Sequence, residues 1–233
     1  MMDGAEGPWT QPKTYVSNAR FISKSTAHDF VPDGNLTKPA WAHAEWVTVD
    51  RDAFKPRTFP ESATAIASLW TPRYIYFAYK CKYTTLNVYE GKDSSQDFWT
   101  LWDRDVVEVF LNPQPERMLH YYEFEVAPNN LWIDLEIDLD KNPMNDPQWN
   151  SGFEHATQVD AKTHTWTCEM RIPVAGLKGV GTVEANAEWR LNLFRADGQG
   201  DDTRRRFLSW SPVQNKTDSF HAPWSFGVIR FVR

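Results

Sequence analysis

Residues 64–83 read TAIASLWTPRYIYFAYKCKY. Successive side chains of a β-strand point to opposite faces, so apolar residues at every second position predict a half-buried strand. Residues 74–83 show this period of two, and residues 64–70 predict a second strand. Thr71-Pro72-Arg73 between them predicts a turn, because proline fixes φ at a value that turns need. The stretch therefore predicts a β-hairpin. Its regularly spaced apolar residues are Ile75, Phe77, Tyr79 and Cys81.

The same alternation recurs along the rest of the chain. We expect further strands over residues 105–111, 121–126, 131–139, 153–159, 165–172, 189–196, 207–210 and 226–232. Proline, glycine and asparagine separate them at short intervals, which is typical of sandwiches and barrels. Helical periodicity is nearly absent, and only Pro173–Leu177 predicts a single helical turn. The sequence predicts an all-β, antiparallel, jelly-roll-like β-sandwich with minimal helix.

The length of 233 residues fits one sandwich domain over 1–233. Before Trp46 we expect irregular structure, with residues 1–30 as an irregular N-terminal extension. Pro32-Asp33-Gly34-Asn35-Leu36 predicts a tight turn in which Gly34 or Asn35 takes a positive φ. Cys81 and Cys168 each alternate with apolar residues, so both are expected in the core, and a disulfide stays open.

The charge of the chain limits which partners it can bind. The net charge of -6 argues against nucleic acid as a partner, since nucleic-acid binding needs a basic face. The basic run Arg204-Arg205-Arg206 follows Asp201-Asp202 and predicts a solvated turn.

Apolar runs of membrane-spanning length are missing, so we expect no membrane span. Met1-Met2-Asp3-Gly4 shows no signal peptide, so we expect a cytoplasmic protein, or a secreted or periplasmic one whose leader was removed.

The aromatic residues of the chain indicate a site that binds a ligand. The chain has 12 Trp, many for its length, and a surplus of indoles is typical of a site that stacks on flat apolar faces. Trp102 lies in a polar loop that leads into the strand at residues 105–111. In that strand Glu108 shares one face with Val106 and Phe110. A carboxylate among apolar neighbours needs a partner, which a sugar hydroxyl or an arginine could supply.

An ordered set of segments resembles the family-9 carbohydrate-binding modules and their looser relatives. The segments are Asp33-Gly34-Asn35-Leu36 with Trp41, Tyr76-Phe77-Ala78-Tyr79-Lys80-Cys81, Trp102 through Phe110, Tyr122-Glu123-Phe124-Glu125-Val126, Trp189 through Arg195, and Phe226-Gly227-Val228. The resemblance implies a β-sandwich that binds sugars, often at a glycan end, between two Trp. It also implies structural calcium, and an appended catalytic domain or a glycan-processing enzyme as partner.

The resemblance implies roles at matching positions. Trp102 is similar to the first stacking Trp, and Glu108 to the carboxylate that contacts the sugar. The second Trp is expected from the C-terminal loop, where Trp224 is favoured over Trp210. Polar residues near these positions complete the predicted ligand-binding set. They are Glu123, Asn192 and Arg195.

Two alternatives remain open. Residues 133–140 read IDLEIDLD, which places Asp134, Glu136, Asp138 and Asp140 on one strand face. The pattern resembles the catalytic strand of family-16 glycoside hydrolases, whose retaining chemistry uses two nearby carboxyls. It is also typical of a solvated strand face or of an oxygen-rich calcium site. The other alternative is a structural or interaction domain without a ligand. If these acids line the same groove as Trp102, the interpretation as a glycoside hydrolase is favoured. If they face solvent, that interpretation is rejected.

Overall fold

The computed structural model describes residues 13–146, 148–200, 204–215 and 217–233. Within these ranges the chain forms twelve strands, five short 3-10 helices and no α-helix, as the alternation predicts. The strands are β1 (Arg20–Ser25), β2 (Val47–Val49), β3 (Thr64–Trp70), β4 (Tyr74–Lys82), β5 (Val106–Asn112), β6 (His120–Val126), β7 (Trp132–Asp138), β8 (Glu154–Asp160), β9 (Thr165–Pro173), β10 (Glu188–Asp197), β11 (Arg206–Ser209) and β12 (Gly227–Val232). The 3-10 helices are η1 (Pro39–His43), η2 (Pro60–Ser62), η3 (Leu101–Asp103), η4 (Val174–Gly176) and η5 (Pro223–Ser225).

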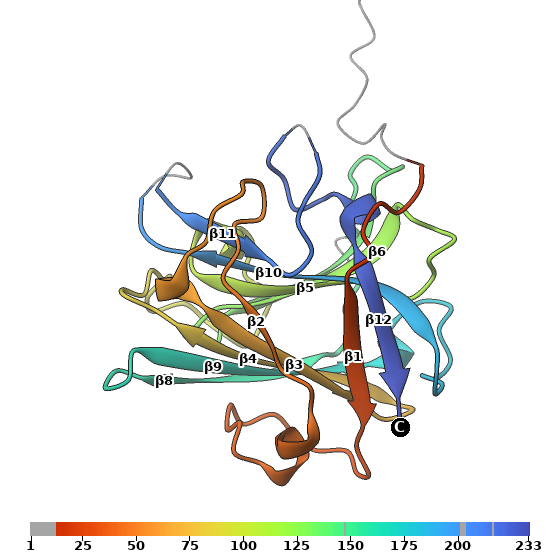
Figure 1. Cartoon of the computed structure of the whole chain (residues 1–233), viewed down its shortest axis with the longest axis horizontal. Helices are drawn as coiled ribbons and strands as arrows, with labels where there is room; N and C mark the ends of the chain where they lie inside the picture. The colour runs from red at the N-terminus through yellow and green to blue at the C-terminus, as the bar shows by residue number, and fades with distance from the viewer. Residues whose placement is uncertain (1–12, 147, 201–203, 216) are drawn as a thin grey trace, which may run out of the picture.

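The strands form one hydrogen-bonded path that folds over into two layers. Its order is β7-β6-β5-β10-β12-β1-β3-β4-β9-β8, with β11 beside β10 and β2 beside β3. In Figure 1 the layer of β5, β6, β10 and β11 lies above the layer of β3, β4, β8 and β9, and β1 and β12 run between them at one side. Pairing is antiparallel except at β1, which runs parallel to both β12 and β3.

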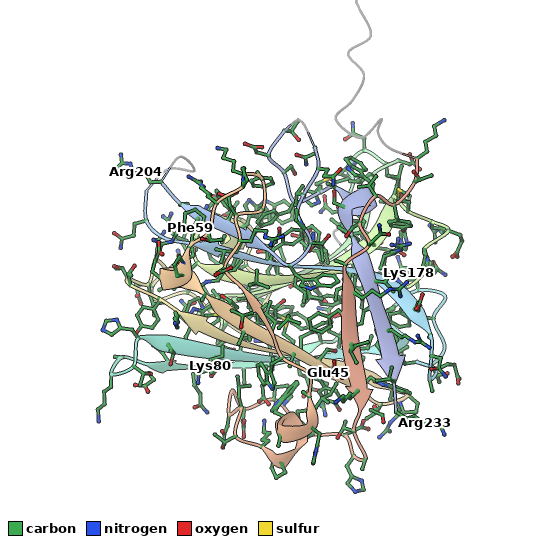
Figure 2. The ribbon with its side chains drawn as sticks, viewed as in Figure 1. Glu45, Phe59, Lys80, Lys178, Arg204 and Arg233 are labelled. Carbon is green, nitrogen blue, oxygen red and sulfur yellow. The ribbon has the colours of Figure 1, made fainter. Side chains whose placement is uncertain are left out.

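The main core fills the space between the layers, as the side chains in Figure 2 show. Val107 and Val109 of β5 enter it from one layer, and Phe77 of β4 and Met170 of β9 enter it from the other. The Tyr79 hydroxyl spans the layers by donating to the Glu108 carbonyl oxygen at 2.9 Å. Cys81 and Cys168 lie in this core as free thiols, so their predicted packing is confirmed and no disulfide links them.

The N-terminal prediction is wrong at β1, because residues 20–25 form a central strand rather than part of an irregular extension. Only Phe21 and Ser23 of β1 are buried. Ser23 pairs its hydroxyl with that of Ser68 at 2.8 Å, so a polar residue occupies a core position. That serine interrupts the apolar alternation by which a strand is recognised. The short β2 was missed as well.

The turn at residues 32–36 is confirmed, with Gly34 at φ +78°. Its backbone N–H groups at Asp33 and Gly34 donate to the buried Glu169 carboxylate at 2.8 and 2.9 Å. Trp41 Nε1 donates to the same carboxylate at 2.6 Å. These bonds fasten the N-terminal segment to the outer face of the β3–β4–β9 layer. The candidate site lies across the molecule, on the outer face of the other layer.

Candidate functional site

A pocket of about 720 Å³ opens on the face of β5 and β6 that points away from the main core. Val107 and Val109 point into the core, so Val106, Glu108 and Phe110 point toward the pocket, as the alternation predicts. The pocket is lined by Asp52, Phe54, Lys55, Arg57, Trp99, Trp102, Asp103, Glu108, Phe110, Glu123, Glu125, Leu135, Ile137, Met144, Asn145, Ala196, Arg205, Phe207 and residues 217–221.

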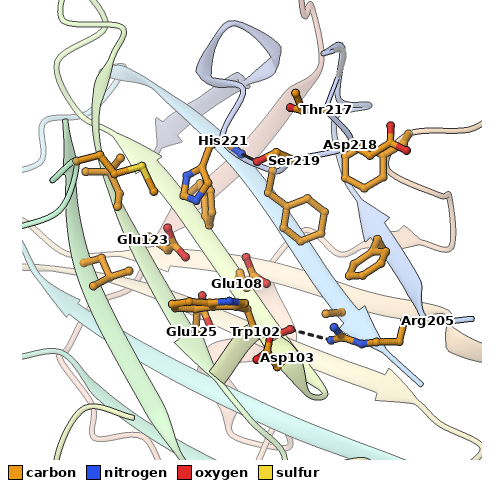
Figure 3. Close-up of a pocket in the computed structure, with 18 of the residues that line it drawn as sticks. Trp102, Asp103, Glu108, Glu123, Glu125, Arg205, Thr217, Asp218, Ser219 and His221 are labelled. Carbon is orange, nitrogen blue, oxygen red and sulfur yellow. Dashed lines mark hydrogen bonds between the residues drawn. The ribbon is translucent and has the colours of Figure 1, made fainter. Parts of the chain in front are cut away.

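Three glutamates from neighbouring strands meet in this pocket, as Figure 3 shows. Glu108 of β5 lies directly opposite Glu125 of β6, and Glu123 follows on the same face of β6. Each contributes a carboxylate oxygen to a set that lies within 4.8 Å of one another. All three side chains are buried, with 3% or less of their surface exposed. The sheet register therefore places three carboxyl groups close together among apolar side chains.

The environment of these carboxyls opposes their ionisation. Burial raises the pKa of Glu108 well above its usual range, Glu123 raises it further, and Arg205 lowers it. Burial also raises the pKa of Glu125, with added repulsion from Glu108 and Glu123. A buried carboxyl beside other carboxyls is harder to ionise, so its protonated form is favoured. In that form a carboxyl can donate a hydrogen bond as well as accept one.

One wall of the pocket carries two indoles. Trp99 is 53% exposed, and it meets Trp102 edge to face with ring centroids 5.1 Å apart. Thr100, at φ 66°, precedes η3 and turns the chain so that both indoles reach the pocket. The buried Arg205 donates to the carbonyl oxygens of Trp102 at 2.8 Å and Arg104 at 2.7 Å. These bonds hold the Trp102 loop against β11.

The 217–221 loop forms another wall. The Phe220 ring stacks on Phe194 with centroids 4.0 Å apart, and its ring is also stacked with Phe54 at 5.7 Å. His221 Nδ1 shares a hydrogen bond of 2.6 Å with the Tyr121 hydroxyl. Burial lowers the pKa of His221, so its imidazole is neutral at neutral pH. Aromatic packing thus fixes a loop in which sequence periodicity gave no prediction.

The structure brings together three of the predicted ligand-binding residues, Trp102, Glu108 and Glu123. Trp224 and Trp210 do not line the pocket. Trp224 is 2% exposed and donates through Nε1 to the Gln214 carbonyl oxygen at 2.5 Å. Trp210 packs edge to face on Phe21, with centroids 5.5 Å apart, against the main core. Both indoles stabilise the fold, and the 207–224 region supplies Phe207 and Phe220 to the pocket instead.

Asn192 and Arg195 also lie outside the pocket. Asn192 is buried and bonds the backbone of Ser211 in both directions, at 2.9 Å each. Arg195 is buried on the core side, where it donates to Asp197 at 2.9 Å and to the Ser62 carbonyl oxygen at 2.7 Å. Its carboxylate partner is therefore Asp197, two residues along the same strand, and not a glutamate of the pocket.

The predicted solvated turn at Arg204-Arg205-Arg206 is wrong for its last two residues. Arg205 is 5% exposed and faces the pocket. Arg206 pairs with the buried Asp197 at 2.7 Å. Asp201 and Asp202 lie outside the described residues.

The acidic strand does not join the pocket, and it does not face solvent either. Strand β7 presents Leu135 and Ile137 to the pocket, so its acids point to the opposite face. Asp134 and Glu136 are buried there, at 2% and 6% exposure. Asp134 accepts from the N–H and hydroxyl of Ser151. The solvated-face prediction is wrong for these two residues because the chain beyond β7 covers them.

Partners of Glu136 also bear on the calcium reading of this strand. Glu136 pairs with His120 at 2.8 Å and with Lys178, and Asp138 pairs with Lys141 at 3.2 Å. Carboxylates already bonded to basic side chains are poor candidates for a metal. The pocket glutamates differ from Glu136 and Asp138, because both oxygens of Glu125 and Oε2 of Glu123 are buried with no hydrogen-bond partner. On β7, Asp134 Oδ1 is the one oxygen in the same state. An oxygen-only donor set such as that of the pocket glutamates fits calcium.

Sequence reasoning missed Glu125, Trp99, Phe220 and His221. Glu125 was within reach, because it alternates with Phe124 and Val126 and must share the face of Glu123. Trp99 could have been found as the indole three residues before Trp102. The loop residues gave no signal, since their positions depend on packing with distant segments.

Comparisons with known proteins agree with this geometry. A family model described as carbohydrate family 9 binding domain-like matches residues 32–233. An extracellular protein of Arthroderma benhamiae is 27% identical over 146 residues, which cover 57% of this chain and 63% of that protein. The chain thus matches less than two thirds of that relative's length.

Solved structures share the fold. A Bacteroides uniformis protein has a TM-score of 0.75 at 20% identity, over 92% of this chain and 100% of that one. A family 9 carbohydrate-binding module of Caldicellulosiruptor kristjanssonii in complex with glucose has a TM-score of 0.64 at 18% identity, covering 92% and 97%. The cellotriose complex from the same organism has a TM-score of 0.64 at 17% identity, covering 92% and 94%.

Proposed function

This chain belongs to the carbohydrate family 9 binding domain-like family, and we propose that it binds the end of a glycan in the Trp102 pocket without cutting it. One observation carries the proposal: indole and phenyl rings meet buried carboxyls in a single pocket of about 720 Å³. A sugar ring has apolar C–H faces and polar hydroxyls at its edge. Stacking suits the faces, and carboxyls suit the hydroxyls.

Pocket shape supports recognition of a chain end. Its volume lies within the range of about 300–1,000 Å³ usual for small-molecule sites. The glutamates of β5 and β6 and the apolar side chains of β7 line the sheet side, or floor, of the pocket. We propose that a glycan enters opposite this floor by its end. The structural neighbours bound to glucose and cellotriose support the same ligand class.

Isothermal titration with glucose and cellotriose tests the proposal. We expect a dissociation constant between about 1 μM and 1 mM. Trp102→Ala should weaken binding at least tenfold, because the stacking surface is lost. The matched control is Trp46→Ala, since Trp46 is 39% exposed and does not line the pocket. Equal affinity of Trp102→Ala and the parent protein would rule out this site.

Hydrolysis is the second candidate, and the glutamate cluster is the observation that favours it. Retaining glycosidases use two carboxyls about 5–5.5 Å apart. Glu108 and Glu125 have similar environments in which burial raises both pKa values, whereas hydrolysis needs one acid and one ionised carboxylate. We therefore propose binding over cleavage. Chromatography of cellotriose after long incubation should show no new product, and product lost in Glu108→Gln would favour an enzyme.

We further propose that the protein acts outside the cytoplasm, secreted or periplasmic, next to an appended catalytic domain or a glycan-processing enzyme. The extracellular relative from Arthroderma benhamiae supports this location. None of the helical segments within the described residues could cross a membrane. Fractionation of the native host, with detection by antibody, should place the protein outside the cytoplasm; recovery in the cytoplasm would contradict the proposal.

A further inference from the structure

Burying Glu108, Glu123 and Glu125 together costs more free energy than the recognition of a sugar explains. Like charges directly opposite each other on neighbouring strands are destabilising. Glu108 and Glu125 face each other in this way, so ionising both is destabilising, and Glu123 adds a third carboxyl on the same face. Apolar side chains lie beside them in the sheet, with Phe194 opposite Glu108 and Leu135 opposite Glu123. Burying ionised carboxylates among apolar side chains costs free energy unless a positively charged partner binds them.

Arg205 is a positively charged group that acts on this cluster. The Arg205 guanidinium lowers the pKa of Glu108, and its NH2 group donates to two backbone carbonyls. Glu125 Oε1 and Oε2 are fully buried with no hydrogen-bond partner, and Glu123 Oε2 shares this state. Buried polar atoms in native proteins are nearly always partnered. One carboxylate oxygen from each of the three glutamates lies within 4.8 Å of the others, and all three residues line the pocket.

We propose that Glu108, Glu123 and Glu125 bind a calcium ion at the pocket floor, and that this ion contacts the bound glycan through its open coordination positions. Calcium takes six to eight oxygen ligands at about 2.3–2.6 Å in flexible geometry. Three carboxylates leave positions that water or two vicinal sugar hydroxyls can fill. The ion site stands on the geometry alone, whereas the contact with glycan rests on the proposed function.

Calcium is favoured over a softer metal by the donor set. All three ligands are carboxylates, and no thiolate or imidazole joins the set, which suits a hard cation. Among the described residues this is the one grouping of three such ligand atoms. The family resemblance implies a calcium ion with a structural role, whereas the ion proposed at this site contacts the ligand.

Terbium provides the test, because it occupies calcium sites and emits when a nearby tryptophan transfers energy to it. The protein is stripped with a chelator and titrated with Tb³⁺ at pH 7.5 while tryptophan is excited. We expect saturable emission that Ca²⁺ displaces, and at least a tenfold loss of Ca²⁺ affinity in Glu125→Gln. The control is Glu90→Gln, an exposed glutamate that does not line the pocket. Circular dichroism establishes that Glu125→Gln is folded.

The outcomes separate the ion site from the sugar site. Equal Ca²⁺ affinity in Glu125→Gln and Glu90→Gln, or no displaceable emission, overturns the ion site. Cellotriose titrations with chelator and with 10 mM Ca²⁺, a concentration on the order of ten times a weak extracellular-type constant, then test the contact. We expect cellotriose to bind at least tenfold more weakly in chelator, and equal affinity overturns the contact. Cellotriose binding without any Ca²⁺ binding leaves the proposed function intact, and Ca²⁺ binding without any sugar binding defeats the proposed function alone.

Discussion

Two groups of acidic side chains lie on opposite faces of the β5–β6–β7 layer, and they differ in their partners. On the core side, Glu136 of β7 meets His120 and Lys178. On the pocket side, Glu125 of β6 lies opposite Glu108, and neither of its oxygens has a hydrogen-bond partner. Both side chains are buried, at 6% and 0% exposure.

The difference shows that burial alone does not identify a functional acid. A buried carboxylate bonded to basic side chains contributes to the fold, and removing it removes those hydrogen bonds. A buried carboxyl without partners weakens the fold, and a ligand is the remaining source of compensation. Mutations at Glu136 and Glu125 should therefore change stability in opposite directions.

The largest effect is expected at Glu136. Glu136→Ala removes bonds to His120 and Lys178, and a hydrogen bond to a charged group contributes about 1.5–3 kcal/mol. Lys178 is 54% exposed, so its share is screened by water. We expect the free energy of unfolding to fall by about 2–3 kcal/mol in urea titrations. Asp140→Ala, an exposed acid just beyond β7, should change it by less than about 0.5 kcal/mol.

A smaller effect of opposite sign is expected for Glu125→Gln in metal-free protein at pH 7. The amide has Glu125's shape, carries no charge, and can donate to Glu108 or Glu123. We expect stability to rise by about 1–2 kcal/mol, by analogy with buried charges replaced by neutral groups. If Glu125→Gln instead lost as much stability as Glu136→Ala, the proposed difference between the acids on the two faces would be contradicted.

The pH dependence sharpens the same prediction. The pKa of Glu125 is raised in the folded state, so the folded protein holds a proton that the unfolded chain releases above about pH 4.3. Stability therefore falls as pH rises from that value through the folded pKa, by up to about 1.4 kcal/mol per pH unit. Asp105 and Asp134, with pKa values raised to about 7 and 6 by burial, act in the same direction in parent and variant. The advantage of Glu125→Gln should thus be small at pH 5 and grow toward pH 7.

Sequence patterns predicted the pocket-side acids better than their partners. Alternation placed Glu108 on the face of its strand that lines the pocket, because side-chain direction in a strand follows from parity alone. The same rule gave ten of the strands, with boundaries shifted by about one residue. Local order was therefore enough wherever the strand itself determined the direction of a side chain.

Partners at long range were not predictable in this way. Lys178 lies 42 residues from Glu136 and Ser151 lies 17 residues from Asp134, and no local pattern links them. Trp224 was favoured because of its residue type and its place before β12, yet η5 turns its indole inward to Gln214. The 217–221 loop has no periodicity, and stacking of Phe220 on Phe194 sets its position. Residue type indicates what a side chain can do, whereas only the fold determines which neighbours it meets.

The smallest stability effect should come from calcium, and it tests whether a ligand compensates the pocket glutamates. An ion that binds only the folded state stabilises it by RT ln(1 + [L]/Kd), which is about 1.4 kcal/mol at ten times Kd. Thermal melts of metal-free protein at pH 7.5 should therefore show a rise of about 3–5 °C on adding calcium at that level. Glu125→Gln should start from a higher melting temperature and gain little from calcium, because it has lost a ligand and the repulsion that the ion relieves. Glu136→Ala should start lower and keep the full rise, since its site lies on the other face of the layer. An equal rise in all three proteins would mean that calcium binds elsewhere, and that the unpartnered glutamates are compensated by some other ligand.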